Sequence, residues 1–383
     1  MLSFEFATAS RIIFGAGKLN SLAEQLEGRM KRLLLVRGRS SDAIPRVKEI
    51  LSAREIQFTE FEVHGEPTVE VVRAGAEVAR GIDFVIGLGG GSILDAGKAI
   101  AILATNPGDV LDYLEVIGKG ETFTHAPLPY IAIPTTAGTG AEVTRNAVIE
   151  SPAHGVKVSL RSPLMLPGLA LVDPELTYSL PPAITASTGL DALTQLIEPF
   201  VSVKANPMTD AVCREGMRYA ARALRRVYED GGDKESRERM SLASLFGGLA
   251  LANAALGAVH GFAGPLGGML HAPHGAICAR LLPSVIEANL KALKAREPGH
   301  PTLPRYAEIA QILTGDANAT ASDGVTWVSE LVRDLNIPAL STYGMSHEHF
   351  PEAVERTMKA SSIKGNPILL TEAELTGILE KAS

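Results

Sequence analysis

The feature that most constrains the fold is a change of residue pattern at the Pro181-Pro182 pair. Before this pair, short apolar and β-branched runs alternate with stretches of helical periodicity, as in an α/β sheet. After it, Ala- and Leu-rich stretches follow one another, so the second half is predicted to be helical. Because prolines break a helix and favour extended backbone before them, we predict an α/β domain over 1–180 and an all-α domain over 181–383.

The expected elements follow from the periodicity. Strands are expected at 32–36, 57–63, 84–88 and 128–133, and helices at 44–51, 69–80, 210–228, 237–256 and 275–293. The strands ending near Val36, Leu88 and Ile133 run into loops of Gly, Ser or Thr. Open α/β sheets bind their ligands at such strand ends, so these loops are the first candidates for a binding site.

Composition excludes several classes of function. The 383 residues are 46% hydrophobic, and 36 Lys and Arg against 43 Asp and Glu give a net charge of −7. An acidic chain is not expected to bind nucleic acid or an anionic membrane. No apolar run approaches the roughly 20 residues of a membrane-spanning helix, and the N-terminal residues do not resemble a signal peptide. We therefore expect a soluble, cytoplasmic enzyme or small-ligand binder.

Cysteine is scarce, whereas histidine is locally concentrated. With only Cys213 and Cys278 present, neither a disulfide scaffold nor a cysteine-based zinc site is expected. Any metal is expected to be bound by histidine and carboxylate. His260, His271 and His274 lie in one short segment and are the first candidates.

The segment 87–98 is a candidate pyrophosphate site. It reads Gly-Leu-Gly-Gly-Gly-Ser-Ile-Leu-Asp-Ala-Gly-Lys and lies between a predicted strand and a predicted helix. Consecutive glycines allow backbone N–H groups to approach phosphate at a helix N-terminus. Asp95 and Lys98 share a helix face, where they can reach a nucleotide or pair with each other. The alternative is a plain glycine turn with a surface ion pair.

The segment 134–144 is a second polar loop, rich in threonine and glycine. Its hydroxyl and N–H groups suit a ribose or a carboxamide. The alternative is a loop that caps a helix.

A candidate metal site lies in the second half. Asp191 and Gln195 are four residues apart on one helix face, and His260 and His274 follow later in the chain. One carboxylate and two imidazoles can form a three-ligand site with an open position, suited to zinc or ferrous iron. Taken singly, each histidine can equally be a hydrogen-bonded structural residue.

Taken together and in order, these motifs resemble those of the iron-containing (group III) alcohol dehydrogenases, which are related to glycerol dehydrogenase and dehydroquinate synthase. The resemblance runs from about residue 14 to about residue 289. The residues in register are Gly89-Gly90-Gly91-Ser92, Asp95, Lys98, Pro134-Thr135-Thr136, Gly138-Thr139-Gly140, Glu142-Val143-Thr144, Asp173-Pro174, Gly189, Asp191-Ala192, His260 and Pro273-His274-Gly275. It implies a dinucleotide-binding domain, a helical domain, a cleft between them and a homodimer.

The resemblance also implies roles for individual residues. The implied cofactor contacts are Gly90, Gly91, Ser92 and Asp95 at the pyrophosphate, Thr135, Thr136 and Thr144 around the nicotinamide end, and Lys157. The implied metal ligands are Asp191, His260 and His274. The implied activity is hydride transfer between NAD or NADP and a small alcohol or carbonyl compound, with the metal acting as a Lewis acid.

Two positions depart from the family pattern. Gln195 stands where a histidine usually follows the aspartate by four residues, and Gly264 stands where one follows His260 by four. The amide oxygen of Gln195 is a neutral, weaker ligand than imidazole, so metal binding is expected to be weaker or differently selective. His271 is the candidate to replace the proton-relay imidazole missing at Gly264.

Gly38 stands where members that prefer NAD carry an acidic residue. Arg37, Arg39, Ser40 and Ser41 flank it. Arginines and hydroxyls can bind a 2′-phosphate that a carboxylate would repel, so NADP is expected to be accepted or preferred. The alternative is that both arginines face solvent.

Three other functions stay open. One is a metal-independent enzyme like maleylacetate reductase, and another is a lyase like dehydroquinate synthase, against which the lack of a Lys and Arg cluster counts. The third is a nucleotide binder that has lost catalysis, which the retention of Asp191, His260 and His274 disfavours.

Overall fold

The computed structural model describes residues 3–26, 31–39 and 41–383, which form two compact units. One unit, here called the α/β unit, consists of Ala7–Thr136 and Gly140–Ser179. The other, the helical unit, consists of Leu180–Ser383 with the short segments Met1–Phe6 and Ala137–Thr139. Within the described residues no single helix is long and apolar enough to cross a membrane; α8 (Lys234–Ala254) and α9 (Ala258–Leu270) satisfy this test only as a pair bent by 100°.

A parallel sheet of six strands in the order β1-β8-β5-β4-β2-β3 forms the centre of the α/β unit. The strands are β1 (Ile12–Phe14), β2 (Arg32–Arg37), β3 (Gln57–Glu62), β4 (Phe84–Gly89), β5 (Tyr130–Pro134) and β8 (Leu169–Val172). The helices of this unit are α1 (Leu22–Gln25), α2 (Ala43–Ala53), α3 (Val69–Val78), α4 (Gly91–Leu103) and α5 (Val110–Tyr113). A separate antiparallel hairpin pairs β6 (Asn146–Ser151) with β7 (Val156–Arg161).

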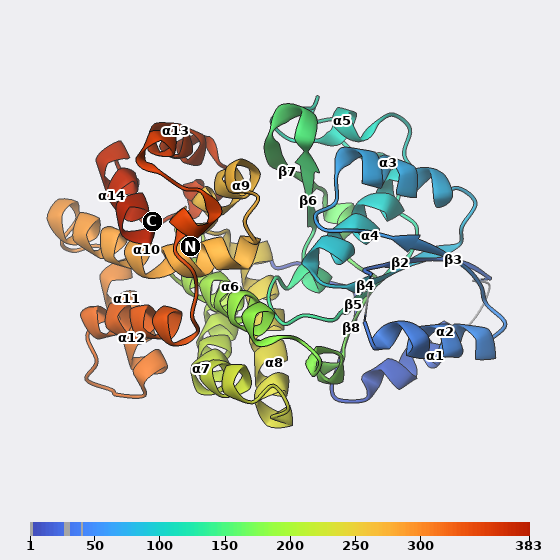
Figure 1. Ribbon diagram of the computed structural model, residues 1–383, viewed down its shortest axis with the longest axis horizontal. Helices are drawn as coiled ribbons and strands as arrows, with labels where there is room; N and C mark the ends of the chain where they lie inside the picture. Colours follow the sequence, from blue (N-terminus) through green and yellow to red (C-terminus); the bar gives the residue numbers. More distant parts are fainter. Residues whose placement is uncertain (1–2, 27–30, 40) are drawn as a thin grey trace. The chain divides into compact units, whose positions relative to one another are not determined.

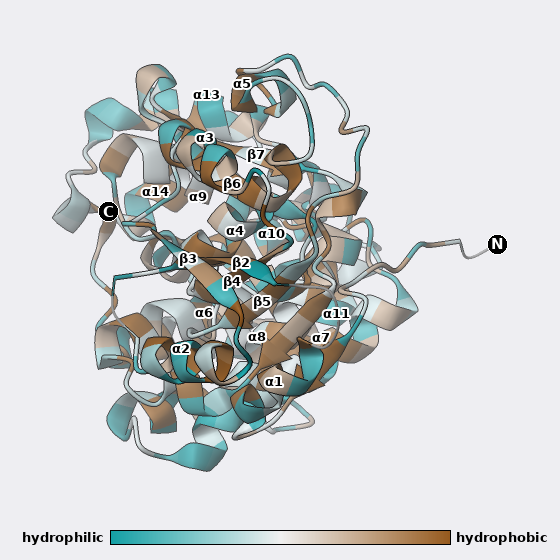
Figure 2. Cartoon of the chain, turned by 90° about the vertical axis from the view of Figure 1, so that its right-hand side faces the viewer, coloured by the Kyte–Doolittle hydropathy of each residue, from teal (hydrophilic) through white to brown (hydrophobic). Residues whose placement is uncertain are grey.

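Both faces of this sheet are covered by helices (Figure 1). In β2, Leu33 and Leu35 pack with α2 on one side, while Leu34 and Val36 pack with α4 on the other. Burial on both faces explains why these strands are continuous apolar runs and not alternating ones. By contrast, α2 covers one face only, and its residues alternate between hydrophobic and hydrophilic along the helix (Figure 2).

The direction of the strand connections reverses between β2 and β4. From β2 the chain passes through α2 to β3 on one side, and from β4 it passes through α4 to β5 on the other. The register pairs Arg37 with Leu88 and Gly89 with Pro134, so the carboxyl ends of β2, β4 and β5 lie side by side. Open α/β sheets bind ligands at such a reversal point.

The helical unit packs its helices around one apolar core. Its helices are α6 (Pro182–Val201), α7 (Pro207–Glu229), α8, α9, α10 (His274–Arg296), α11 (Thr302–Thr314), α12 (Ala321–Asp334), α13 (Phe350–Lys359) and α14 (Glu372–Ala382). Every residue of α6 from Gly189 to Val201 is buried, because α7, α8 and α10 pack around it. Polar side chains on α6 are therefore held inside the unit.

The predicted fold class is confirmed: a parallel sheet with helices in the first half and helices in the second. The predicted helices at 44–51 and 275–293 are observed as α2 and α10, one to three residues longer at each end. Among the strands, β1, β8 and the β6–β7 hairpin were not predicted. The two short strands lie at the end of the sheet away from β2, with three residues in β1 and four in β8. Runs of that length carry too little periodicity to identify from sequence.

Candidate functional site

Helix α6 carries three polar side chains on one face of an otherwise largely apolar helix. Asp191, Gln195 and Glu198 follow one another at steps of four and three residues, which places them on the same side. Their exposed fractions are 1%, 3% and 4%. Polar groups buried to this extent are retained only where they have partners, so the structure around them identifies what the site can bind.

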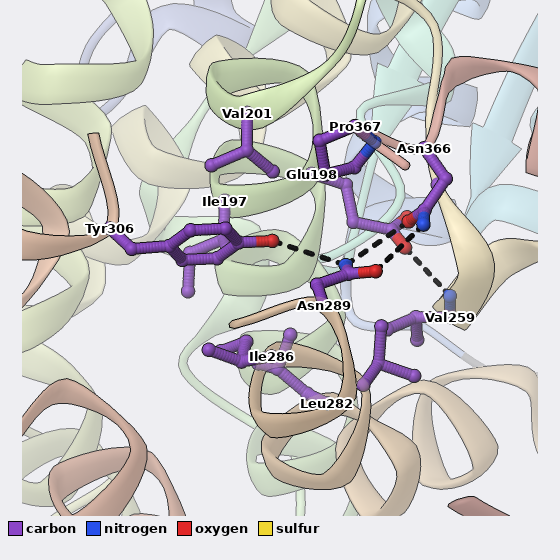
Figure 3. A pocket seen from close by; sticks show the side chains of 12 residues that line it. Ile197, Glu198, Val201, Val259, Leu282, Ile286, Asn289, Tyr306, Asn366 and Pro367 are labelled. Carbon is purple, nitrogen blue, oxygen red and sulfur yellow. Dashed lines mark hydrogen bonds between the residues drawn. The ribbon is translucent and has the colours of Figure 1, made fainter. Parts of the chain in front are cut away.

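Glu198 holds the first turn of α9. Its Oε1 accepts a hydrogen bond from the Val259 N–H at 2.7 Å (Figure 3), and Asn366 Oδ1 accepts one from the Ala258 N–H at 3.2 Å. His260 Nδ1 lies 2.7 Å from Glu198 Oε2. A carboxylate only accepts, so Nδ1 carries a proton whether His260 is neutral or charged. Nε2 is therefore the nitrogen that can bind a metal, once any proton on it has been displaced.

A small pocket lies behind Glu198 and is lined by the residues that support it (Figure 3). Asn366 Nδ2 donates to Asn289 Oδ1 at 2.7 Å, and Asn289 Nδ2 donates to Tyr306 Oη at 3.1 Å. Gly257, the N-cap of α9, permits the close approach, because a Cβ there would lie 2.9 Å from Glu198 Oε1 and 3.0 Å from Asn366 Oδ1. The position of His260 is thus determined by a buried polar network.

Helix α10 contributes two further groups to the site. His274 is its first residue, and its Nε2 lies 3.8 Å from Asp191 Oδ1. Cys278, one turn later, places its Sγ 3.6 Å from His274 Nε2. One ligand atom from each of Asp191, His260, His274 and Cys278 lies within 4.8 Å of the others. The structure thus places Cys278 beside the three predicted ligands, where a metal site made only of histidine and carboxylate was expected.

Three buried polar atoms at this cluster lack a hydrogen-bond partner. They are Asp191 Oδ1, Gln195 Oε1 and His260 Nε2, which are among only six such side-chain atoms in the described ranges. Asp191 Oδ1 and His260 Nε2 lie 3.4 Å apart without forming a hydrogen bond. Leaving such atoms unsatisfied costs about 1–3 kcal/mol each. Asp191 Oδ1 and His260 Nε2 face each other, and His274 Nε2 lies 3.8 Å from the same carboxylate oxygen, so these three residues suit a divalent metal.

The charges around the two histidines also favour a cation. Burial opposes the protonated form of His274, but Cys278 and Asp191 outweigh it and raise the pKa of His274 to about 9. Burial likewise opposes charge on His260, yet Cys278, Asp191 and Glu198 raise the pKa of His260 well above its ordinary value. For Asp191, burial is outweighed by His274 and His260, which lower its pKa. The site therefore stabilises positive charge, as a divalent ion would require.

At the reversal point of the sheet, the glycine-rich loop lies at the start of α4. Gly90 is the N-cap of this helix and offers no side-chain cap, so the helix N-terminus is open to an anion. A Cβ at Gly90 would lie 3.3 Å from Thr136 Cγ2, and the Thr135 N–H donates to Gly89 O at 2.9 Å. Gly91 and Ser92 form the first helical residues and are partly exposed. The structure thus brings these five predicted cofactor residues together.

Gly38 lies beside the same loop, since a Cβ built on it would be 3.6 Å from Ile93 Cγ1. The guanidinium of Arg37 is already occupied: it pairs with Glu60 at 2.5 Å and with Glu62 at 2.7 Å. Arg39 is exposed. Ser40 lies outside the described residues. Arg37 thus already has two carboxylates as partners, Glu60 and Glu62. The expectation that Arg37 binds the 2′-phosphate of NADP assumed that its guanidinium is available.

Asp95 and Thr144 are engaged within the protein. Lys98 is completely buried, and its Nζ lies 3.0 Å from Asp95 Oδ1 and donates to Thr144 Oγ1 at 2.9 Å. Asp95 Oδ2 accepts from the Val148 N–H at 2.9 Å, which ties α4 to β6. Lys157 on β7 lies 3.6 Å from Glu66. The side chains of Asp95 and Thr144 therefore hold the loop and the hairpin in place and do not point to an open surface.

His271 is not brought into the cluster of ligand atoms. It is the C-cap of α9, adopts a left-handed conformation with φ of 50° and is exposed. At Gly264, a built Cβ meets no heavy atom of the described residues within 4 Å. The position that usually carries the family's second histidine thus borders open space in this chain.

Two residues of the site were missed at the sequence level, Glu198 and Cys278. Each had a usable signal, because Glu198 continues the helix face of Asp191 and Gln195, and Cys278 lies one helical turn after His274. Neither signal by itself distinguishes a site residue from a core residue. Their partners come from other helices, which only the packed structure brings together.

Comparison with known proteins agrees with this fold. The family model described as iron-containing alcohol dehydrogenase matches residues 9–174, and the C-terminal model of the Fe-containing alcohol dehydrogenase family matches residues 185–383. Alcohol dehydrogenase 4 of Saccharomyces cerevisiae (strain ATCC 204508 / S288c) is 36% identical over 377 residues, covering 96% of each chain.

Two further matches extend over nearly the whole chain. The NADPH-dependent butanol dehydrogenase of Clostridium saccharobutylicum is 34% identical over 394 residues, covering 98% of this chain and 97% of that one. The crystal structure of a 1,3-propanediol oxidoreductase superposes with a TM-score of 0.92 at 34% identity over 100% of both chains. The chain therefore belongs to the iron-containing alcohol dehydrogenase family, oxidoreductases that use NAD(P) and a divalent metal.

Proposed function

We propose that this chain is an NAD(P)-dependent alcohol dehydrogenase, or carbonyl reductase, whose helical unit holds a divalent metal on Asp191, His260 and His274. The observation that carries the proposal is that Asp191 Oδ1 and His260 Nε2 are buried without a hydrogen bond and face each other at 3.4 Å, with His274 Nε2 beside them. When bound, the metal supplies a Lewis acid that polarises a substrate carbonyl or stabilises an alkoxide.

The residues around the ligands have separate tasks. Glu198 keeps the proton of His260 on Nδ1, so that Nε2 stays free. Gln195 Nε2 donates to Asp191 Oδ2 at 3.1 Å, which leaves Oδ1 directed to the histidines. This arrangement supports a form of the family in which glutamine replaces one histidine and orients the aspartate.

The α/β unit is proposed to bind the dinucleotide at its reversal point. Gly90, Gly91 and Ser92 would hold the pyrophosphate at the N-terminus of α4, with Thr135 and Thr136 alongside. Asp95, Thr144 and Lys157 are proposed to act on the cofactor through the shape of the loop and hairpin, since the first two are paired within the protein. Residues 1–180 would thus serve the cofactor, and residues 181–383 the metal and the substrate.

Use of NADP stays a prediction. Arg39 is a better candidate than Arg37 for binding the 2′-phosphate. The side chain of Arg37 is held by Glu60 and Glu62, and these carboxylates would repel a 2′-phosphate. Arg39 is exposed, and we propose that it binds the 2′-phosphate. Initial rates with NADH and NADPH, for the wild type and for Arg39→Ala, test this. A strong preference of the wild type for NADH would refute it.

The central experiment is turnover with and without metal. Protein treated with a chelator and desalted should fail to oxidise reduced cofactor with a panel of small aldehydes, and added Zn²⁺ or Fe²⁺ should restore the rate. The variant Asp191→Asn removes a ligand charge while keeping the shape, and should not respond to added metal. Full activity of the metal-free wild type would overturn the proposal in favour of a metal-independent enzyme. The named functions of the relatives favour neither that alternative nor the lyase.

A homodimer and a cytoplasmic location are proposed on the resemblance alone. Light scattering of the purified chain would test the first, and cell fractionation the second.

A further inference from the structure

The identity of the fourth protein ligand is open, because the usual histidine of the family is Gln195 here. The structure offers two candidates, the amide oxygen of Gln195 and the sulfur of Cys278 on α10. We propose that Cys278, as a thiolate, is the fourth ligand and that Gln195 supports Asp191 from outside the metal. This inference rests on the proposed metal function and specifies the chemistry of that site.

The spacing of the ligand atoms suits a sulfur ligand. For zinc bond lengths in a tetrahedral site, two nitrogen or oxygen ligands stand about 3.4 Å apart, and nitrogen and sulfur about 3.6 Å apart. The observed separations are 3.4 Å from His260 Nε2 to Asp191 Oδ1 and 3.8 Å from His274 Nε2 to Asp191 Oδ1. Cys278 Sγ lies 3.6 Å from His274 Nε2. These three separations suit one shared ion, and all four ligand atoms lie within 4.8 Å of one another.

The hydrogen bond from Gln195 to Asp191 places Gln195 on the side of the carboxylate that faces away from the histidines. Its amide nitrogen donates to Asp191 Oδ2, whereas the histidines face Oδ1. Its Cβ and Oε1 pack against Gly247 of α8, where a built Cβ would lie 3.2 Å and 3.4 Å from them. Gln195 is therefore a positioning residue for Asp191.

A thiolate at Cys278 would supply a second anionic ligand beside Asp191. The other buried carboxylate, Glu198, stays outside the metal and accepts hydrogen bonds from the Val259 N–H and from His260 Nδ1. On coordination the thiol proton of Cys278 leaves to solvent and a metal–sulfur bond forms, with no change of oxidation state. With four protein ligands, a substrate oxygen would have to bind as an additional ligand.

The assignment has a consequence for metal choice. A soft thiolate favours zinc over the hard-ligand metals and makes the site more selective for zinc than an all-nitrogen and oxygen set. We expect the full-length chain, offered equal Zn²⁺ and Fe²⁺ without oxygen, to retain zinc, and the variant Cys278→Ser to lose part of this preference.

The test uses Co²⁺ as a spectroscopic probe of the full-length protein. Cobalt bound to the wild type should show a thiolate-to-metal charge-transfer band in the near ultraviolet together with visible ligand-field bands. The band should be lost in Cys278→Ser, while the control Cys213→Ser, which changes the other buried cysteine, should keep it. Circular dichroism of each variant checks its folding.

The outcomes separate this inference from the proposed function. If the wild type binds one Co²⁺ and shows ligand-field bands but no thiolate band, the Cys278 assignment is wrong and the metal site stands. If Cys278→Ser keeps the thiolate band, the assignment is equally wrong. If the wild type binds no cobalt, zinc or iron, both the assignment and the proposed metal function fail.

Discussion

Replacing Glu198 by glutamine is the sharpest available test of how the protein prepares His260. Glu198 accepts two hydrogen bonds, one from the Val259 N–H and one from His260 Nδ1, each at 2.7 Å. The variant Glu198→Gln has the same shape but only one acceptor oxygen. The backbone N–H of Val259 cannot change its role, so the new amide nitrogen has to face His260.

The changed hydrogen bond between residue 198 and His260 determines how much zinc affinity the variant should lose. Either His260 moves its proton to Nε2, which removes the lone pair needed for a metal, or it keeps the proton on Nδ1 and loses the bond to a charged partner. Such a bond contributes about 1.5–3 kcal/mol. Since each 1.4 kcal/mol is about tenfold in affinity, zinc binding should weaken by about 10-fold to 100-fold. Loss of other partners that orient metal-bound histidines has effects of about this size.

The assay is a competition titration of Zn²⁺ between the protein and a chromophoric chelator at one pH. Glu142→Gln is the matched control, because Glu142 is also buried but belongs to the α/β unit. The control should bind zinc like the wild type, and Glu198→Gln without metal should melt close to the wild-type temperature. Unchanged zinc affinity in a folded Glu198→Gln variant would refute the role assigned to Glu198.

Three predictions concern the α/β unit. Burial raises the pKa of Glu142 from its ordinary 4.5 to about 7, so the folded chain keeps this proton to higher pH than the unfolded chain. The free energy of unfolding should therefore fall by up to about 3 kcal/mol between about pH 4.5 and about pH 7, and Glu142→Gln should flatten this slope in urea titrations. Lys98→Met leaves Asp95 buried without its cation and should cost about 3–5 kcal/mol in urea unfolding, part of which Asp95→Asn should restore. A Cβ at Gly87 would lie 2.1 Å from Tyr130 Oη, so Gly87→Ala should lower the melting temperature, at a cost of about 1–3 kcal/mol; a wild-type melting temperature would contradict the packing described for β4.

For Arg37, the sequence predicts the position of the residue but not its partners. Its position after a strand and beside Gly38 is a local property and could be predicted. Its partners could not, because they depend on strand register: β2 pairs with β3 so that Arg37 stands opposite Glu62, with Glu60 two residues earlier on the same strand. A charge in a binding loop is available to a ligand only when no neighbouring strand supplies a counter-charge.

The sequence by itself determined the elements and the first set of candidate ligands. Strand and helix periodicity is local, and it predicted α2, β4 and α10 to within a few residues of their bounds. The order of the motifs, through their resemblance to the family, indicated Asp191, His260 and His274 as the candidate metal ligands. Only the tertiary structure decided what completes and orients these groups. Glu198 and His260 are 62 residues apart, and Cys278 meets Asp191 across two helices. Such pairings arise from helix packing around a shared core, where a buried group is satisfied by whichever partner the packing brings within reach.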